Sequence, residues 1–346
     1  MNGTSTVHDR TSVVIAARNA GHTITGCLEA LQRQTAPELL HEVIVVDNNS
    51  TDDTAVAAAR AGAMVVHQPV VGAAAARNAG IAAATGDIIA ITDADCVPAD
   101  GWLEAITAPL RADPSITAAK GAYRTSQREL FARFVQLEYE DKYDLLERQE
   151  LIDFVDTYSA AYRRDAIVAV GGFNQDIFYV EDQELSFRLA ENGARMVFAP
   201  KAVVEHLHAD SLRSYLRKKY FIGYWKAFVV RRYPNVAVKD SHTPQVLKVQ
   251  MLLASALGVS VGAAPLAPAA ASVVSTASAA AFGLSSVPFV RKAWRSDRAV
   301  GAMAPFGLLA RAVGLTAGFG MGTLAALRRG AVSDPDPDIT LAAVSS

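Results

Sequence analysis

Ile88-Ile89-Ala90-Ile91-Thr92-Asp93-Ala94-Asp95 combines an apolar run with two acids one residue apart. This pattern predicts a buried strand that ends in a pair of carboxylates, whose side chains point to the same side of the chain. Ligands bind at the carboxyl ends of parallel strands in α/β sheets. Carboxylate oxygens there suit Mg²⁺ or Mn²⁺, and these ions are usually shared with substrate phosphates. The stretch therefore predicts a metal and a diphosphate substrate; the alternative is a strand followed by an acidic turn.

Short apolar runs alternate with helical patterns on both sides of this stretch, over residues 12–122. Such alternation predicts a parallel sheet that is covered by helices on both faces. The predicted strands are Val13–Ala17, Val43–Asp47, Met64–His67, Ile88–Thr92 and Ile116–Lys120, and the predicted helices are Thr23–Gln34, Asp53–Ala61, Ala73–Ala83 and Gly101–Ala112. Beyond them we expect a polar helix at Gln127–Gln149, a mixed segment at Tyr158–Phe198 and a basic helix at Ser211–Arg232.

Composition limits the function classes. The chain has 346 residues and a formal net charge of −2, so no bulk attraction to nucleic acid is expected. Cys27 and Cys96 lie far apart and have neither a metal-binding nor a disulfide spacing, which fits a reducing compartment. Residues 1–11 are polar and contain no apolar signal-peptide core, so we expect a flexible N-terminus and a cytosolic N-terminal domain. Alternating Asp and Pro predict a disordered tail at 331–346.

The C-terminal third is apolar. Residues 249–290 contain no charged side chain, and about 20 residues suffice for one bilayer crossing. With a turn at Pro265–Pro268, this segment predicts a helical hairpin that crosses a membrane twice. Lys248 and Arg291 flank the hairpin, which would place both of its ends on the cytoplasmic side. The alternative is a buried or membrane-surface pair of helices.

A second apolar stretch, residues 299–327, carries Arg311 in its middle. A charge at the centre of a bilayer is costly, so this stretch predicts an interfacial helix rather than a third span. We therefore expect membrane-associated helices over residues 245–330.

Four segments with chemical potential follow one another along the N-terminal half. They are Val13–Asn19, Val43–Asp52, Gly72–Gly80 and Thr85–Asp95. Asp47 ends the second strand, where it either accepts hydrogen bonds from a base or ribose or caps the following helix. Arg77 lies on a helix of small residues and either presents its guanidinium to a phosphate or is a surface arginine.

The order of these segments resembles family 2 glycosyltransferases, over residues 12 to about 232. The resemblance implies an α/β chain with the nucleotide-sugar-binding GT-A fold, a mixed, mostly parallel sheet flanked by helices. It implies a nucleotide-sugar-binding half at 12–122 and an acceptor-binding half at 123–240. The residues that it assigns to the nucleotide sugar are Ala17, Arg18, Asp47, Asn49, Arg77, Asp93 and Ala94. It also implies a Mn²⁺ or Mg²⁺ ion, with Asp95 as the more direct ligand and Asp93 beside it.

A Glu181-Asp182 pair stands at the start of a predicted helix, after a Gly171-Gly172 turn. The acids either interact favourably with the helix N-terminus or act in catalysis. Inverting transfer needs a base for the acceptor hydroxyl. The resemblance makes Asp182 that base and lets Glu181 orient the acceptor or the base.

Two histidines, His206 and His208, follow the last predicted strand. The resemblance implies that one of them completes the metal shell, and imidazole is a suitable ligand for Mn²⁺. We favour His206; the alternative is a surface histidine in a turn.

The basic helix Ser211–Arg232 interleaves cationic and aromatic residues, and the apolar stretch after it favours a membrane surface over nucleic acid. The Gln-x-x-Arg-Trp signature of processive relatives is missing, because the sequence here is Leu216-Arg217-Lys218-Lys219-Tyr220. We therefore expect transfer of one sugar per acceptor.

The sequence thus predicts an inverting, metal-dependent glycosyltransferase on the cytoplasmic face of the cell membrane. The expected donor is a nucleoside-diphosphate sugar, by default a UDP-sugar, and the expected acceptor is a lipid-linked or cell-envelope glycan. A sugar nucleotidylyltransferase would need a Gly-rich basic loop after the first strand, and Ala16–Gly21 is a poor version of one. A dinucleotide oxidoreductase would need Gly-x-Gly-x-x-Gly, which is not present. A non-catalytic sugar-nucleotide-binding membrane protein is the remaining alternative.

Overall fold

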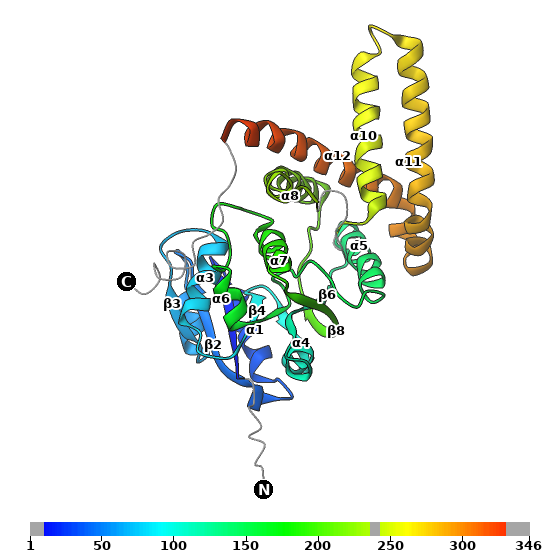
Figure 1. Cartoon of the computed structure of the whole chain (residues 1–346). Coiled ribbons are helices and arrows are strands. Elements are labelled where there is room, and N and C mark those ends of the chain that lie inside the picture. Colours follow the sequence, from blue (N-terminus) through cyan, green and yellow to red (C-terminus); the bar gives the residue numbers. More distant parts are fainter. Residues whose placement is uncertain (1–9, 236–242, 330–346) are drawn as a thin grey trace. The chain divides into compact units, whose positions relative to one another are not determined.

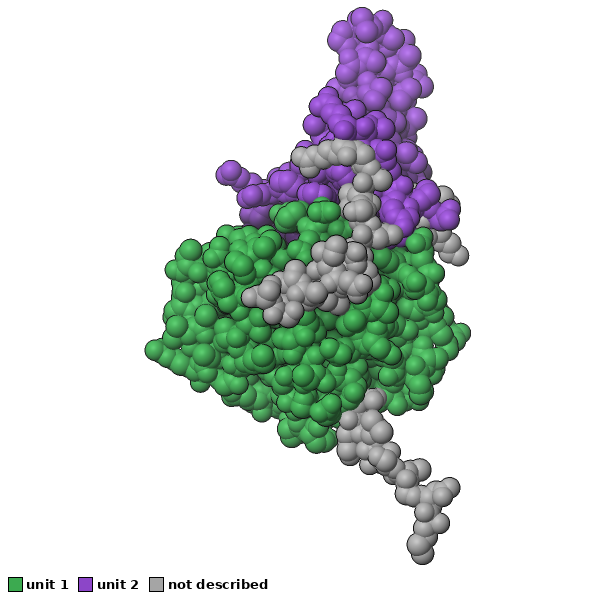
Figure 2. Space-filling view, turned by 60° about the vertical axis from the view of Figure 1, so that its left-hand side comes forward, with its two compact units in different colours: residues 1–124, 146–207, 333–346 green, residues 125–145, 208–332 purple. Residues whose placement is uncertain are grey.

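The computed structural model describes residues 10–235 and 243–329. These residues form two compact units, which Figure 2 shows in different colours. The sheet unit contains the described residues of 10–124 and 146–207. The helical unit contains those of 125–145 and 208–329. The predicted flexible residues 1–9 and the predicted tail at 331–346 lie outside the described residues.

The sheet unit is built on one eight-stranded sheet with the order β3-β2-β1-β4-β7-β6-β8-β5. Its strands are β1 Thr11–Ala17, β2 Leu40–Asp47, β3 Met64–His67, β4 Ile88–Asp93, β5 Val97–Pro98, β6 Ile116–Arg124, β7 Ala160–Arg163 and β8 Arg195–Glu205. The pairs among β1 to β4 are parallel, as is β6 with β8, whereas β7 is antiparallel to both of its neighbours and β5 to β8. The sheet is therefore mixed and mostly parallel, as predicted.

Strand register brings the predicted polar residues to one edge of the sheet. Ala17 of β1 pairs with Asp47 of β2, and Ala16 pairs with Asp93 of β4. The parallel direction of β1, β2 and β4 makes all three carboxyl ends meet there. Two aspartates that are 46 positions apart in the sequence thus come to lie on either side of one strand.

Helices and one 3-10 turn cover this sheet. They are α1 Ile24–Gln32, η1 Pro37–Leu39, α2 Thr54–Arg60, α3 Ala73–Ala83, α4 Trp102–Ala112, α6 Arg164–Ala169 and α7 Glu181–Glu191. The alanine-rich α3 packs closely on β1 and β2. A Cβ at Gly80 would come within 2.3 Å of a Val14 methyl and 3.1 Å of a Val46 methyl. Small residues on α3 are therefore a packing requirement of the sheet, as the sequence suggests.

The predicted strands and helices of residues 12–122 are confirmed, with shifts of a few residues at their ends. The prediction that residues 1–11 are flexible is wrong for Arg10 and Thr11. Thr11 begins β1, and the backbone N–H of Arg10 donates to Asp87 at 3.1 Å. The mixed segment Tyr158–Phe198 contains β7, α6, α7 and most of β8, whose type the local pattern does not indicate.

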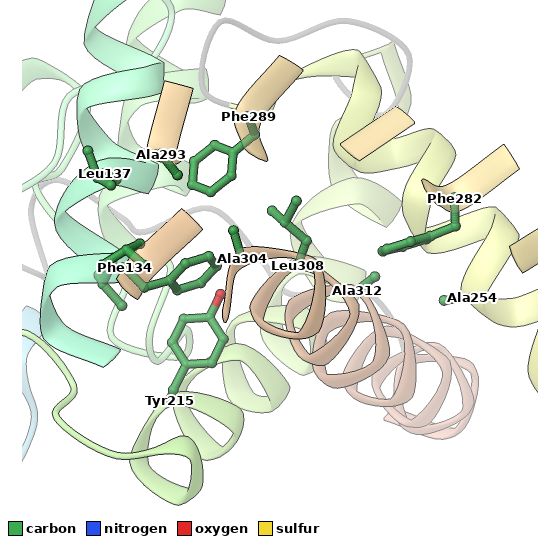
Figure 3. Packing of buried hydrophobic residues seen from close by; sticks show 12 residues of the cluster. Phe134, Leu137, Tyr215, Ala254, Phe282, Phe289, Ala293, Ala304, Leu308 and Ala312 are labelled. Atoms are coloured by element: carbon green, nitrogen blue, oxygen red, sulfur yellow. The ribbon is translucent and has the colours of Figure 1, made fainter. Parts of the chain in front are cut away.

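The helical unit contains α5 Leu130–Leu146, α8 Leu212–Arg232, α10 Gln245–Ala263, α11 Pro268–Ser296 and α12 Arg298–Arg329. Ser211 and Ser214 form a capping box at the start of α8, which satisfies backbone N–H groups there. Figure 3 shows the apolar cluster that joins these helices, with Phe134 of α5, Phe289 of α11 and Leu308 of α12 among its members. Helices α10 and α11 run side by side in opposite directions, with their turn at Ala264–Ala267, beside Pro268 (Figure 1).

Arg311 is buried in the middle of α12. Its Nη1 donates to Glu138 of α5 at 2.9 Å, and its Nη2 donates to Gln250 of α10 at 2.8 Å. Lys219 of α8 also lies 3.3 Å from Glu138. Burial by itself would raise the pKa of Glu138, but Lys219 and Arg311 lower it. The charge that the sequence places in an apolar helix is thus paired within the protein.

Within the described residues, three helices, α10, α11 and α12, are long and apolar enough to cross a membrane by length and composition. They differ in how much of their apolar surface the protein covers. In the most apolar window, 22% of the residues of α10 and 17% of those of α11 are buried, against 56% for α12. Most of the apolar surface of α10 and α11 is thus not covered by the protein, whereas more than half of the apolar window of α12 is buried against other residues.

Candidate active site

The loops after β1 and β2 are held together at the carboxyl edge of the sheet. Asp47 is buried; its Oδ1 accepts from the Ser50 backbone at 3.2 Å, and its Oδ2 lies 3.3 Å from Nδ1 of His67. Asn19 and Asn49 both adopt positive φ, of 51° and 58°, a conformation that asparagine tolerates better than most residues. Arg18 and Asn49 are exposed beside these turns. The predicted base-binding residues therefore surround one end of β1 and β2.

A buried arginine links two of the predicted acids. Arg77 on α3 is 5% exposed; its Nη2 donates to Asp93 at 3.0 Å and its Nη1 donates to Glu181 at 2.7 Å. Its guanidinium also lies 5.5 Å from the centre of the Phe173 ring. The alternative of a surface arginine is wrong. Arg77 instead ties the end of β4 to the first turn of α7.

Asp182 follows Glu181 in the first turn of α7. Burial, together with the negative charges of Glu181 and Asp156, raises the pKa of Asp182 well above its usual range. Val180, the residue before the helix, has no side chain that could cap it. The Glu181 carboxylate accepts a hydrogen bond from Arg77. A carboxyl group with a raised pKa at the edge of a site is suited to accept a proton near neutral pH.

A loop near Asp182 contributes the acid of a second charged pair, which the sequence does not indicate. Lys120 of β6 and Asp156 are both buried and form an ion pair. Ser186 of α7 fastens this loop to the helix: its hydroxyl accepts from the Val155 backbone at 2.9 Å and donates to the Asp182 carbonyl at 2.7 Å. Asp156 is therefore fixed close to Asp182, where its charge acts on the predicted base.

The glycine turn before α7 is held from two sides. Gly171 and Gly172 have φ values of 80° and 66°, which glycine adopts without strain. Arg188 of α7 donates to the Gly172 carbonyl at 2.8 Å, and Asn78 of α3 pairs with both backbone groups of Phe173 at 2.8 Å. The turn predicted from the two glycines is confirmed, and it positions α7 against α3.

The predicted metal ligands are partly assembled. Oδ1 of Asp95 lies 3.7 Å from Nδ1 of His206, whereas Asp93 is turned to Arg77. His206 is buried, so the alternative of a surface histidine is wrong. The second histidine, His208, belongs to the helical unit, where its Nε2 lies 3.0 Å from Gln136 and its ring stacks on Tyr139. Of the predicted ligands, the structure thus brings Asp95 and His206 together, and their binding of a Mn²⁺ or Mg²⁺ ion stays a prediction.

Residues 12–171 match the family model described as Glycosyl transferase family 2. This segment is a family 2 glycosyltransferase domain. The chain is 34% identical over 180 residues to the pre-mycofactocin glycosyltransferase of Mycobacterium tuberculosis, and this alignment covers 49% of this chain and 38% of that protein. The chain is also 26% identical over 226 residues to glycosyltransferase AglE of Haloferax volcanii, and this alignment covers 61% of this chain and 71% of that protein. The chain thus spans well under two thirds of the mycobacterial relative.

The fold is similar to that of a solved mannosyltransferase, PcManGT from Pyrobaculum calidifontis in complex with GDP-Man and Mn²⁺. The TM-score is 0.55 at 21% identity, over 89% of this chain and 86% of that one. The glycosyltransferase domain therefore has the predicted GT-A fold, and the similarity extends over most of the chain.

Two features of the glycosyltransferase domain escaped sequence reasoning. Lys120 and Asp156 sit in segments with no recognisable motif, so no local signal could have found them. Cys96 directly follows Asp95, and its Sγ lies 3.6 Å from Nδ1 of His206. The short sequence spacings therefore miss Cys96, because its neighbour His206 directly follows the end of β8, more than 100 positions away.

A cavity of about 280 Å³ opens beside Glu181. Its walls come from the loop after β3, the first turn of α3 and the loop before α7: Val70, Val71, Gly72, Ala73, Ala74, Ala75, Gln175, Ile177, Phe178 and Tyr179. Tyr179 has a φ of 66°, which is unusual for a bulky residue. The cavity provides mostly apolar space next to the Glu181 carboxylate.

Proposed function

We propose that this protein is an inverting, metal-dependent glycosyltransferase that transfers one sugar from a nucleoside-diphosphate sugar to a membrane-associated acceptor. The observation that carries the proposal is the chain of contacts Asp93–Arg77–Glu181, which joins the end of β4 to the helix that begins with Glu181 and Asp182. A GT-A domain is expected to hold its donor at the end of β4. The contacts link this strand end to Asp182, the residue proposed to activate the acceptor.

Each residue has a proposed role. Asp47, Ala17, Arg18 and Asn49 surround the nucleotide, while Asp93, Ala94 and Arg77 lie beside the sugar and diphosphate. Asp95 and His206, with Asp93 near them, hold a Mn²⁺ or Mg²⁺ ion. When bound, such an ion neutralises negative charge on the leaving diphosphate.

Asp182 removes the proton from the acceptor hydroxyl. Its raised pKa supports this role, because a carboxylate that binds a proton more tightly is a stronger base. Glu181 is held by Arg77 at 2.7 Å and keeps the first turn of α7 in place. The hydroxyl oxygen then attacks the anomeric carbon, the bond to the diphosphate breaks, and the anomeric configuration inverts.

Helices α10 and α11 are proposed to anchor the enzyme in the membrane. Leu252 and Val259 of α10 are 71% and 72% exposed, and Leu266 in the turn before α11 is 90% exposed, which is costly in water and favourable in lipid. Because Arg311 is paired inside the helical unit, α12 is proposed to lie at the membrane–water interface rather than to span the bilayer. Two spans leave both ends of the hairpin on the cytoplasmic side, and a lipid-linked or cell-envelope glycan fits an acceptor at that face.

The test is donor turnover by the purified full chain in detergent. We expect one nucleoside-diphosphate sugar of a panel that contains UDP- and GDP-sugars to release free diphosphate slowly with Mn²⁺. Asp182→Asn should bind that donor as the wild type does and transfer sugar about 10²–10⁴-fold more slowly. Glu191→Gln, at the exposed end of α7, is the matched control and should retain full rate.

Two outcomes decide against the proposal. Turnover by Asp182→Asn at the wild-type rate rejects the base assignment. Binding of a donor without any hydrolysis or transfer by the wild type favours the non-catalytic alternative. A nucleotidylyltransferase would instead form a nucleoside-diphosphate sugar from a nucleoside triphosphate and a sugar phosphate, which the same chromatography detects.

A further inference from the structure

Sheet register places Cys96 opposite His206. Val97 of β5 pairs with Glu205 of β8, and Pro98 pairs with Val204 in the same antiparallel ladder. One further step along that ladder brings Cys96 across from His206. Since Asp95 precedes Cys96, three different metal-binding groups meet at the end of a two-residue strand. Their ligand atoms all lie within 4.8 Å of one another.

The three distances match a tetrahedral zinc site. Cys96 Sγ lies 3.6 Å from His206 Nδ1 and 3.9 Å from Asp95 Oδ1, and the last two atoms are 3.7 Å apart. Zinc bonds of about 2.3 Å to sulfur and 2.0–2.2 Å to nitrogen or oxygen require ligand separations of roughly 3.4–3.6 Å at tetrahedral angles. Movements of a few tenths of an ångström therefore suffice to close the site around one ion.

The groups are held in place, and the site is accessible to an ion. The ring of His206 packs on Tyr158, with centroids 4.4 Å apart, and its backbone N–H donates to the Arg124 carbonyl at 2.8 Å. Cys96 is fully buried, while the side chain of Asp95 is 44% exposed. An ion can therefore enter past the carboxylate and meet a preformed imidazole and thiol behind it.

We propose that Cys96, His206 and Asp95 form a binding site for Zn²⁺ or another thiophilic divalent ion. The fourth position is open to water. Mn²⁺ and Mg²⁺ prefer oxygen ligands, whereas thiolate selects zinc, so Cys96 distinguishes the two kinds of ion. On binding, the zinc–sulfur bond forms while the thiol proton passes to solvent, with no change in oxidation state.

The site shares Asp95 and His206 with the ion of the proposed transfer reaction. Zinc therefore competes with Mn²⁺ and inhibits transfer. This consequence rests on the proposed function, but the binding of zinc does not. The two are tested separately, so that failure of one is distinguishable from failure of the other.

Cobalt(II) gives a direct readout of sulfur ligation, because a cobalt–thiolate bond produces a charge-transfer band in the near ultraviolet. The full chain in detergent is first freed of metal with a chelator and then titrated with Co²⁺. We expect the band to saturate at one ion per chain and to disappear when Zn²⁺ is added. Cys96→Ser should abolish it.

Cys27→Ser is the matched control. Cys27 is also fully buried and close to the acids, with its Sγ 3.7 Å from the Asp93 carbonyl, but it is not part of the cluster. This variant should keep the band. His206→Gln retains the thiol and should weaken zinc affinity at least tenfold in a competition titration, which provides a second test if Cys96→Ser fails to fold.

A wild type without the band, or a band that persists in Cys96→Ser, overturns the proposal. A band that is lost in Cys27→Ser and kept in Cys96→Ser assigns the sulfur ligand to the wrong cysteine and also overturns it. In Mn²⁺-supported turnover, zinc should inhibit the wild type at least tenfold more strongly than Cys96→Ser, each compared with its own zinc-free rate. Equal inhibition rejects the competition while leaving the cobalt result to decide zinc binding.

Discussion

Replacing Arg77 by methionine tests the linkage at the centre of the site. The guanidinium neutralises Asp93 and Glu181 at 3.0 and 2.7 Å, and it is almost completely buried. Methionine keeps much of the volume of the side chain but leaves two carboxylates without their counterion. Removal of one partner from a buried ion pair typically costs about 3–5 kcal/mol, because the remaining charge is uncompensated.

The expected loss is large enough for a thermal melt. In a unit of 150–250 residues, each kcal/mol shifts Tm by about 2–4 °C, so Arg77→Met should lower the apparent Tm by roughly 6–20 °C. The melt is followed with the full chain in detergent at neutral pH. Arg60→Met, at the exposed end of α2, is the matched control and should change stability by less than about 0.5 kcal/mol.

A second variant separates charge from packing. Asp93→Asn and Glu181→Gln, added to Arg77→Met, remove both uncompensated charges without changing the shape of their side chains. Most of the lost Tm should then return. If Arg77→Met has the same Tm as Arg60→Met, or if the two added amide substitutions do not raise the Tm of Arg77→Met, the assigned role of the ion pairs is refuted.

Three further predictions follow from charges and close contacts. Asp156→Asn removes a charge that raises the pKa of Asp182, so the acidic limb of the pH–rate profile should move to lower pH; an unchanged limb would show that the two groups do not interact. Folding raises the pKa of Asp182, so the folded state loses stability as pH rises through the raised pKa and the buried side chain becomes charged. Asp182→Asn removes this charge and should therefore raise Tm at neutral pH; a lower Tm would contradict the prediction. Gly318→Ala would place a Cβ 1.9 Å from the Tyr220 carbonyl oxygen and should cost about 1–3 kcal/mol, whereas Gly258→Ala meets open space and should not lower Tm in the same melt.

The first half of the sheet could be predicted from sequence because its signals are local. Each of β1 to β4 is a short apolar run, and parallel pairing needs only the alternation with helices to be recognised. The same reasoning placed Asp47 and Asp93 at strand ends. Parallel register then brings these ends together without further information.

The second half could not be predicted in the same way, since its contacts are non-local. Strand β7 has four residues and inserts antiparallel between β4 and β6, which no periodicity in Ala160–Arg163 announces. Cys96 meets His206 through pairing of β5 with β8. A search for short cysteine spacings cannot detect ligands that different strands contribute.

Arg311 illustrates the same limit for the apolar helices. Its position in an apolar stretch indicates a cost in lipid, and this argues against a central place in a bilayer. That its partners are Glu138 and Gln250, from two other helices, emerges only from packing. Similarly, the place of Arg77 near a phosphate stays a prediction, and its pairing with two carboxylates emerges only from packing.

The most direct test of the account is metal-dependent nucleotide binding, measured as a thermal shift of the full chain with a panel of nucleoside diphosphates. Ligand binding to the folded state raises Tm with the logarithm of ligand concentration over Kd. We predict that at least one nucleoside diphosphate raises the Tm of the wild type with Mn²⁺ and much less without it, and that Asp95→Asn abolishes the metal-dependent part. If no nucleoside diphosphate shifts the Tm with Mn²⁺ or Mg²⁺, or if Asp95→Asn responds as the wild type does, the proposed donor site is contradicted.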